Sequence, residues 1–597
     1  MDALLVNGIH FCKNNTMPQL GSICLYEKLK KIYDVDIVNF DYLFYKGDIK
    51  YSDDMEENIN LFAKYILQFN PKIVQFYTIC ISYPLMLLIA EEVKKLNKDI
   101  VIIMGGPQVT STPAESLSRF EFIDVIGLGE GEPYICTLVD ALLNKKSLKD
   151  IRGIAFKSEG QIYINNYDKV VDASELGVYT KFDFQKYIDI FESIDEDIKN
   201  YEFQLEAGRG CPFNCTFCSS SIFWKRKFRV KSAERIIDEI KFFHNKYGFL
   251  NFSLDHDMFT ANKSYLMNFC KLLIESTLNI KWGCSSRLDV LDDEMLIEMK
   301  KSNCNSIYVG FESGSQVMQK SINKNLDIEQ ALKTIKKIKD LGMKITVSFI
   351  YGFPEEKESD FLKTIEVIEK LYALDCENIQ LHKYFPLPST NEKEKIDTLY
   401  FDEDDIDLAI YNNSIYKGSL DNLIKKDKEI FSAFYSFNSI VREKYRRMDF
   451  LITFLNIMKK YFKKTIEYLI SKKGLVYIYS QCESDIIQAY KEVNNRSLNE
   501  YLLNYKEREI LQDLFVNIFN KMTKCINDIV IKEIFRFENI LYQYGTQKIK
   551  EDKIYFFEVD VLEIEKGNSK CEEKICFVKF EKKSDEILVK KLKINNK

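Results

Sequence analysis

Two successive series of short apolar runs, separated by amphipathic segments, constrain the fold of this chain more than any other feature. In the first series, within residues 1–175, five runs have the length and composition of strands: 3–6, 35–39, 73–77, 100–104 and 125–127. Segments between them, such as 23–32 and 82–96, have apolar residues at helical spacing. Alternating strands and helices form a parallel, doubly wound sheet, whose ligands bind beyond the carboxyl ends of the strands.

The second series, within residues 195–395, repeats the alternation with six strands joined by five helical segments. The expected strands are 203–207, 251–254, 280–284, 306–309, 345–350 and 378–383. This pattern predicts a partial barrel of the TIM type, a (β/α)6 arrangement with functional groups at the carboxyl ends of its strands.

Residues 400–597 follow a different pattern. The acidic run 402–407 precedes long Lys- and Tyr-rich helical stretches, and the segments 554–564 and 575–580 alternate apolar with charged residues. We therefore expect an α/β protein of three regions: a Rossmann-like domain over 1–175, a partial barrel over 195–395, and a mostly helical region over 400–597 that ends in a small antiparallel sheet.

Composition excludes several classes of function. The chain has 84 Lys and Arg against 90 Asp and Glu, a net charge of -6, which disfavours nucleic-acid binding. No stretch approaches 18 uncharged apolar residues, and the first residues lack the basic region of an export signal, so we expect no membrane association. Fifteen cysteines spread over 597 residues are typical of a reducing compartment, and the expected location is the cytoplasm.

Three cysteines form the most specific motif. Cys211, Cys215 and Cys218 occupy a loop directly after the first strand of the second series. A structural zinc site needs four ligands, and no nearby Cys or His completes a familiar spacing. An iron-sulfur cube held by three cysteines leaves one iron open to a substrate or cofactor. A zinc knuckle or unrelated buried thiols are the alternatives.

With Phe217 before its last cysteine and a partial barrel around it, this motif resembles that of the radical SAM superfamily. The segments Gly310–Gly314 and Gly352–Glu356, after the fourth and fifth barrel strands, agree with the resemblance. The segments Gly105–Pro107 and Gly129–Glu132 narrow the resemblance to the branch of the superfamily that has an N-terminal cobalamin-binding domain. The resemblance covers roughly residues 1–395.

The resemblance implies three cofactors: a 4Fe-4S cluster, S-adenosylmethionine (SAM) and cobalamin. The three motif cysteines would hold the cluster, whose electron cleaves SAM to a 5'-deoxyadenosyl radical. Arg287 would pair with the SAM carboxylate through its planar fork, a surface salt bridge being the alternative. Glu312 would accept hydrogen bonds from the ribose or the amino group. Further candidates on the barrel side are Gly310, Ser313, Ile350, Gly352 and Asp255.

Some of these assignments have competitors. An ordinary turn explains Gly352 as well as a place near the adenine does. Asp255 and Asp257 stand where the superfamily often has a Gly-Gly-Glu motif, which this chain lacks, and Asp257 is also a candidate helix N-cap. His256 and His382 follow strands, where they would either handle protons or satisfy a local hydrogen bond. The helix after the cluster loop should begin at Ser232, an N-cap residue.

In the N-terminal domain, the Asp-x-His-x-x-Gly motif that supplies an axial histidine is missing, and His10 does not match it. The resemblance therefore implies cobalamin bound without a histidine ligand. The candidate cobalamin-binding residues are the loop 14–21 and Thr78, Ser82, Tyr83, Gly105, Gly106, Gly129 and Gly131. Taken alone, these glycines are also typical of ordinary turns.

The leading hypothesis is a cobalamin-dependent radical SAM C-methyltransferase that acts on an unactivated carbon of a peptide or natural-product intermediate. One SAM would methylate cob(I)alamin, and a second would generate the radical that activates the substrate. Rearrangement or cyclisation without methyl transfer is an alternative, and an iron-sulfur and cobalamin sensor protein is another. The enzyme would need a reductant such as flavodoxin or ferredoxin. The C-terminal region would help to select the substrate, and Cys571 and Cys576 within it favour packing over a second metal site.

Overall fold

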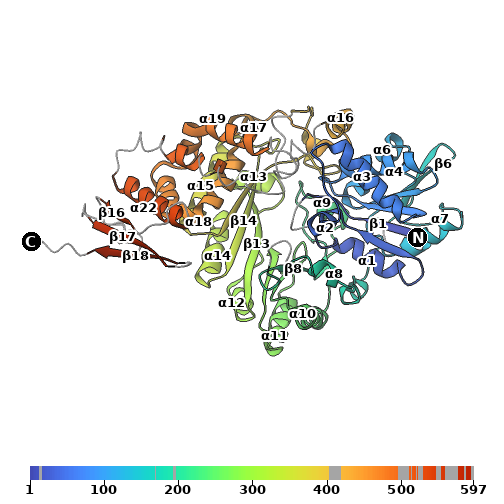
Figure 1. Ribbon diagram of the computed structural model, residues 1–597, viewed down its shortest axis with the longest axis horizontal. Helices are drawn as coiled ribbons and strands as arrows, with labels where there is room; N and C mark the ends of the chain where they lie inside the picture. Colours follow the sequence, from blue (N-terminus) through green and yellow to red (C-terminus); the bar gives the residue numbers. More distant parts are fainter. Residues whose placement is uncertain are drawn as a thin grey trace, which may run out of the picture.

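The chain is described from a computed structural model. The described residues are 1–11, 16–167, 170–191, 197–402, 418–494, 510–511, 514–519, 521, 529–545, 553–557, 576–583 and 586–592. The N-terminal sheet, a second parallel sheet and a small C-terminal sheet follow one another along the long axis of the molecule (Figure 1).

The N-terminal domain is a doubly wound sheet, as predicted. Its strand order is β2-β1-β3-β4-β5-β6-β7. The five predicted strands are parallel: β1 (Ala3–Val6), β2 (Val35–Val38), β3 (Ile73–Tyr77), β4 (Val101–Gly105) and β5 (Val125–Gly127). Two further strands, β6 (Ile154–Ser158) and β7 (Gln161–Ile164), extend the sheet antiparallel and were not predicted. The strand order reverses between β1 and β3. Ligands of such sheets bind beyond the carboxyl ends of the strands at this point.

Helices cover this sheet because each presents one apolar stripe to it. The longest are α1 (Leu20–Leu29), α3 (Met55–Gln68), α4 (Tyr83–Leu96) and α7 (Ile135–Leu143). In α3 the buried residues include Ile59, Phe62 and Ile66, which recur at helical spacing, and Asp54 caps the helix by accepting from the backbone N–H of Glu56. Local sequence and burial therefore agree along this helix.

The six predicted barrel strands form one all-parallel sheet in the order β15-β14-β13-β12-β11-β8. They are β8 (Glu202–Glu206), β11 (Asn251–Asp255), β12 (Lys281–Ser286), β13 (Cys304–Glu312), β14 (Lys344–Tyr351) and β15 (Asn378–Lys383). Between them lie α10 (Ala233–Tyr247), α11 (Lys263–Glu275), α12 (Asp293–Lys301), α14 (Ile328–Asp340) and α15 (Glu358–Ala373). Neighbours in the sheet are consecutive strands, as in a partial barrel, and all carboxyl ends meet on one edge.

The C-terminal region is mostly helical, as predicted, and packs on both domains. Helix α18 (Met448–Lys473) lies along the outer strand β15, where Lys459 donates to the carbonyl oxygen of Cys376 at 3.0 Å. Helix α16 (Ser419–Lys426) packs on α4 of the N-terminal domain. Two further helices are α19 (Leu475–Asn494) and α22 (Ile529–Gly545).

The small terminal sheet was also predicted. It comprises β16 (Lys553–Phe557), β17 (Cys576–Lys583) and β18 (Glu586–Leu592), paired antiparallel. Most of the acidic run 402–407, the second half of segment 554–564, and Cys571 fall outside the described residues.

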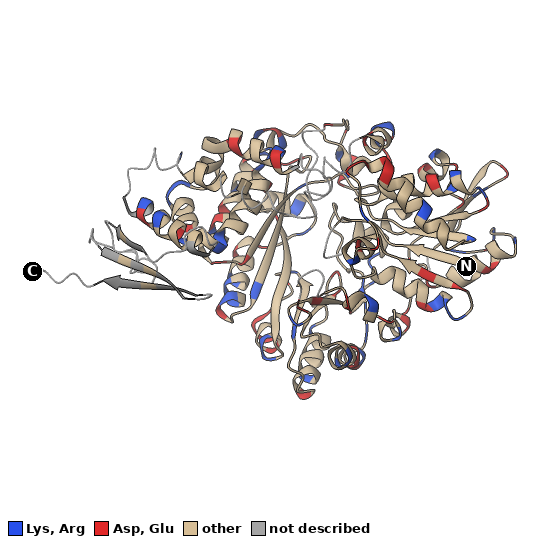
Figure 2. Ribbon diagram, viewed as in Figure 1, with Lys and Arg blue, Asp and Glu red and all other residues tan. Residues whose placement is uncertain are grey.

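The described helices are all too short or too polar to cross a bilayer. Lys and Arg alternate with Asp and Glu along the helices in the view of Figure 2. Such mixed charge is typical of a solvated surface rather than of a polyanion-binding face.

Ser232 caps α10 as the sequence predicts, since its hydroxyl accepts from the backbone N–H of Arg235 at 3.3 Å. We predict that Ser232→Ala weakens the first turn of α10 by about 1 kcal/mol. Hydrogen exchange at the Arg235 amide should then become about fivefold faster. Ser471→Ala, near the end of α18, serves as the control because that hydroxyl only donates to the carbonyl oxygen of Tyr468. Equal exchange in the wild type and Ser232→Ala would contradict the prediction.

Candidate functional site

The three motif cysteines line one cavity of about 580 Å³ at the carboxyl ends of the barrel strands. We call it the barrel cavity. All three thiols are half-buried, on the loop between β9 (Gly208–Arg209) and α9 (Ser219–Phe223). The loop is held from two sides: Thr216 donates to Glu392 at 2.6 Å, and the N–H of Gly210 donates to Asp257 at 2.9 Å. This anchoring keeps the three thiols on one wall.

The three motif thiols border one cavity rather than meeting at a single point. In the part of the chain that the structure describes, no three His, Cys, Asp or Glu side chains converge closely enough to hold a metal ion. The three thiols instead face a wide common space, as a cube of several atoms requires. Burial raises the pKa of Cys211 to about 11 and also raises the pKa of Cys215. A metal centre held by these thiols would therefore have to displace their protons.

Arg287 is buried beside the cysteine loop (residues 210–218), so the salt bridge considered for it is present, to Asp289, but its arginine is not on the surface. Its Nε and Nη2 donate to Asp289, and Nη2 also donates to the carbonyl oxygen of Lys324 at 2.7 Å. Its Nη1 lies 3.6 Å from the sulfur of Cys215, and the guanidinium covers the ring of Phe213 at 3.9 Å. The side chain is thus fixed, with one nitrogen directed at a motif thiol.

Glu312 also lines the barrel cavity. Its φ of 67° is unusual for a residue with a side chain, and it stands at a register shift between β13 and β14. Its carboxylate accepts from the Lys324 ammonium at 2.7 Å. A Cβ at Gly310 would lie 2.1 Å from Glu312 Oε1, so the glycine makes room for this side chain. Ile350 and His382 line the same cavity.

Two predicted barrel residues point elsewhere. The Ser313 hydroxyl lies 3.2 Å from that of Thr364 on α15 and accepts from the N–H of Ser315, so it braces the turn after β13. Gly352 has φ 76°, and a Cβ there would lie 2.5 Å from Arg442 Cγ. Neither residue lines the barrel cavity. The turn explanation of Gly352 therefore agrees with the structure.

A second cavity, of about 410 Å³, lies between the N-terminal sheet and the barrel. We call it the interdomain cavity. Four of the predicted glycines line it: Gly105, Gly106, Gly129 and Gly131. A Cβ at Gly106, where φ is 116°, would lie 2.3 Å from the carbonyl oxygen of Thr78, so no larger residue fits. Leu20 and Gly21 of the predicted loop also line the cavity, whereas Asn14 and Asn15 fall outside the described residues.

The other N-terminal candidates do not line this cavity. Thr78 is buried and donates to the carbonyl oxygen of Gly105 at 3.0 Å. Ser82 is buried beside Gly8, and the Tyr83 hydroxyl donates to Ser116 at 2.8 Å within the core. His10 contacts the Gln19 amide, and burial lowers its pKa to about 4. Thr78 supports the glycine turn from behind, while Ser82 and Tyr83 belong to the core.

Asp255, His256 and Asp257 lie at the carboxyl end of β11. Asp255 and His256 line only the interdomain cavity, and Asp257 lines both. Burial, with the charge of Glu206 second, raises the pKa of Asp255 to about 6. The ring of His256 is held by the carbonyl oxygen of Arg229 and the N–H of Met258, and burial lowers its pKa to about 4. The local hydrogen-bond role of His256 therefore agrees with the structure.

The N-cap expected at Asp257 is wrong. The next helix, α11, is capped instead by Asn262, whose side chain accepts from the N–H of Tyr265. The carboxylate of Asp257 instead accepts from the N–H of Gly210, at the start of the cysteine loop.

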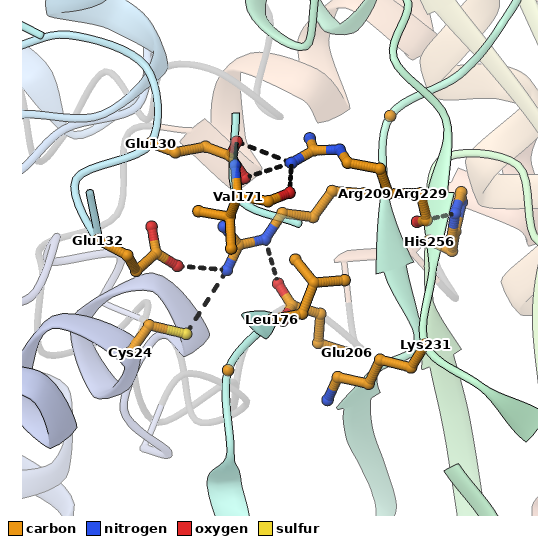
Figure 3. Close-up of polar contacts among 12 residues, drawn as sticks. Cys24, Glu130, Glu132, Val171, Leu176, Glu206, Arg209, Arg229, Lys231 and His256 are labelled. Carbon is orange, nitrogen blue, oxygen red and sulfur yellow. Dashed lines mark hydrogen bonds and ion pairs between the residues drawn. The ribbon is translucent and has the colours of Figure 1, made fainter. Parts of the chain in front are cut away.

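The sequence did not reveal the group of ion pairs around Arg209, shown in Figure 3. Arg209 Nε donates to Glu206 at 2.6 Å, Nη1 to Glu130 at 2.7 Å and Nη2 to Glu132 at 2.7 Å. Glu130 also accepts from Arg229 at 2.8 Å. We call Arg209, Glu130, Glu132, Glu206 and Arg229 the arginine cluster. It joins the β5–α7 loop of the N-terminal domain to the start of the cysteine loop.

The raised pKa of Asp255 predicts a pH dependence of stability. The folded state holds this proton more tightly than the unfolded state, so the stability it contributes is present at low pH and is lost as pH rises from about 4 to 6. The Asp255→Asn variant has no carboxylate to ionise at this position, so its stability does not fall in this way. The free energy of unfolding of the variant minus that of the wild type should therefore rise by about 3 kcal/mol between about pH 4 and pH 6. Urea unfolding followed by tryptophan fluorescence measures the difference. A difference that is constant with pH would contradict the prediction.

Comparisons with known proteins agree with this architecture. The model of the radical SAM superfamily matches residues 205–368. The chain is 30% identical over 382 residues to the uncharacterized methyltransferase PH0819 of Pyrococcus horikoshii, covering 63% of this chain and 77% of that protein. It is 29% identical over 294 residues to the anaerobic magnesium-protoporphyrin IX monomethyl ester cyclase of Rubrivivax gelatinosus, covering 47% of this chain and 50% of the cyclase. The chain thus spans half the length of that cyclase.

Among solved structures, the chain is similar to OxsB, a cobalamin-dependent S-adenosylmethionine radical enzyme determined with aqua-cobalamin and S-adenosylmethionine bound. The TM-score is 0.57 at 14% sequence identity, over 92% of this chain and 81% of OxsB. This similarity extends through both parallel sheets and the helical region. The chain belongs to the radical SAM superfamily of enzymes and shares its overall fold with a cobalamin-dependent member.

Proposed function

We propose that the protein is a cobalamin-dependent radical SAM methyltransferase that acts on an unactivated carbon of a peptide or natural-product intermediate. The observation that carries this proposal is the adjacency of two cavities. Three half-buried thiols line one, glycine turns of a doubly wound sheet wall the other, and Asp257 borders both. A reaction that uses two cofactors on one substrate needs such neighbouring sites.

The barrel cavity supplies the residues that a cluster and SAM require. Cys211, Cys215 and Cys218 would hold a 4Fe-4S cluster, and Arg287 would face the SAM carboxylate near Cys215. Glu312, with Lys324 beside it, would accept hydrogen bonds from the ribose or the amino group. Bound there, the cluster would supply the electron that cleaves SAM.

The interdomain cavity would hold cobalamin, which would carry the methyl group. The backbone at Gly105, Gly106, Gly129 and Gly131 permits close approach of a large ring. No histidine lines the cavity from the described part of the N-terminal domain, and His256 of the barrel is held by its own hydrogen bonds. Cobalamin would therefore bind here without an axial histidine from this domain.

The remaining parts of the proposal concern partners. The donor of electrons would be flavodoxin or ferredoxin, and the protein would work in a reducing, anaerobic cytoplasm. Support comes from 11 cysteines that are free thiols among the described residues. The C-terminal region would help to select the substrate, but α18 also packs along β15, so removing the whole region would expose the core of the barrel.

Rearrangement or cyclisation without methyl transfer is a second candidate, favoured by the similarity to the Rubrivivax cyclase. The sensor hypothesis has less support, because the chain belongs to a superfamily of enzymes. Methyl transfer and rearrangement or cyclisation need the same cofactors. Only the fate of the methyl group of SAM therefore distinguishes these two reactions.

We predict that replacing Cys211, Cys215 and Cys218 together with alanine abolishes iron binding and reductive cleavage of SAM. The physical reason is that the three thiols are the only side chains of this loop that can ligate iron. Iron and sulfide content after anaerobic reconstitution, and release of 5'-deoxyadenosine, are the measurements. The control is Cys270→Ala, a buried thiol on α11 outside both cavities. Retention of the cluster in the triple variant would refute the assignment.

A second prediction concerns the methyl group. With SAM labelled at the methyl carbon, the reconstituted protein and its substrate should give a product that carries the label, as measured by mass spectrometry. An unlabelled, rearranged product formed together with 5'-deoxyadenosine would reject the methyltransferase and favour the second candidate.

A further inference from the structure

Arg209 stands two residues before the first motif cysteine, and its side chain is only 7% exposed. Its guanidinium donates to carboxylates from both domains: Glu206 at the end of β8, and Glu130 and Glu132 on the β5–α7 loop. It also lies 3.6 Å from the sulfur of Cys24 on α1. Figure 3 shows these groups converging on one guanidinium. The arginine therefore connects the cysteine loop to two segments of the N-terminal domain.

The two glutamates alternate with two glycines in the sequence Gly129-Glu130-Gly131-Glu132. The glycines wall the interdomain cavity, and the glutamates pair with Arg209. Because the four residues are consecutive, fixing the glutamates also fixes the glycine wall. The next residue after Arg209, Gly210, is tied to Asp257 at 2.9 Å, so the cysteine loop is fixed at the same place.

The surroundings strengthen these ion pairs. The ring of Trp224 lies 5.8 Å from the Arg209 guanidinium carbon and 5.7 Å from that of Arg229, and it lines the interdomain cavity. Glu130 also accepts from Arg229 and from the N–H of Val171. Charged groups removed from water interact strongly when they are paired, and they are costly to leave unpaired. Loss of Arg209 would leave Glu132 and Glu206 without this cation, while Glu130 would keep its pair with Arg229.

We propose that Arg209 is a positioning residue that sets the place of the cysteine loop relative to the glycine wall of the interdomain cavity, and thereby the relative placement of the two cofactors. This inference rests on the proposed function for its consequence in catalysis. The positioning itself is a property of the polypeptide and can be measured without any cofactor.

The first test uses hydrogen exchange of the full-length, cofactor-free protein. Arg209→Gln should speed exchange both in residues 128–134 and in residues 208–218, because the two loops lose their common partner. Arg209→Lys should have a smaller effect, since an ammonium keeps the charge but not the planar fork. Arg119→Gln, which breaks a different ion pair between the N-terminal domain and Asp427, is the matched control and should change neither loop. Unchanged exchange in one or both loops of Arg209→Gln would overturn the proposal.

The second test uses the reconstituted protein. Arg209→Gln should keep the iron and sulfide content of the wild type, because the cysteines remain, while its affinity for cobalamin falls about tenfold or more. The amount of 5'-deoxyadenosine formed per methylated product should rise. Glu132→Gln should act in the same direction, and the double variant should be no worse than Arg209→Gln, because the two side chains act as one unit.

The outcomes separate the proposal from the proposed function. If iron content fell in step with cobalamin affinity, Arg209 would only support the cysteine loop, and the proposal would be overturned. Additive losses in the double variant would overturn it as well. If the wild type bound no cobalamin, the proposed function would fail, while hydrogen exchange would still decide the role of Arg209.

Discussion

A buried arginine shared by three carboxylates determines how the two parallel sheets of this protein meet. Arg209 belongs to the barrel, and two of its partners, Glu130 and Glu132, belong to the N-terminal sheet. The carboxyl ends of both sets of strands are thereby brought to a common region, where each sheet places its ligand-binding loops. Breaking such a buried group of charges costs about 3–5 kcal/mol, so the arrangement of the domains is held firmly.

This junction gives the two cavities their separate chemistry. The barrel cavity is lined by the thiols, Arg287 and Glu312, whereas glycines, several charged groups and apolar side chains line the interdomain cavity. Asp257 borders both and also holds the cysteine loop through Gly210. One side chain thus links the anchoring of the loop to the boundary between the cavities. At the register shift beside Glu312, the strained backbone directs a carboxylate into the barrel cavity.

The sequence predicted the features that repeat or follow a local rule. The parallel strands of both sheets have apolar runs of characteristic length, and Ser232 precedes its helix as an N-cap should. The three cysteines were identified by their spacing and four of the glycines by their place after apolar strands, and they line the cavities. The Gly105–Gly106 turn is predictable because only glycine tolerates its backbone there.

Features that depend on distant residues were not predictable. Glu130 and Arg209 are 79 positions apart. From the sequence alone, each is indistinguishable from an ordinary charged residue of the surface. Ser313 and Gly352 follow barrel strands as expected, but packing against Thr364 and Arg442 turns them away from the cavity. Asp255 was assigned to the correct strand and lines the other cavity, because that depends on how the domains dock. The antiparallel strands β6 and β7 form a pair at one end of the N-terminal sheet, and each has an apolar run of only three residues.

We propose that Cys211, Cys215 and Cys218 hold a cluster with an open iron, in a cavity that also admits SAM. Electron paramagnetic resonance of the anaerobically reconstituted and reduced protein tests it most directly. We expect the signal of a reduced 4Fe-4S cluster whose g values shift when SAM is added, because SAM would bind the iron that no cysteine occupies. A signal that is identical with and without SAM, or no cluster signal at all, would contradict it.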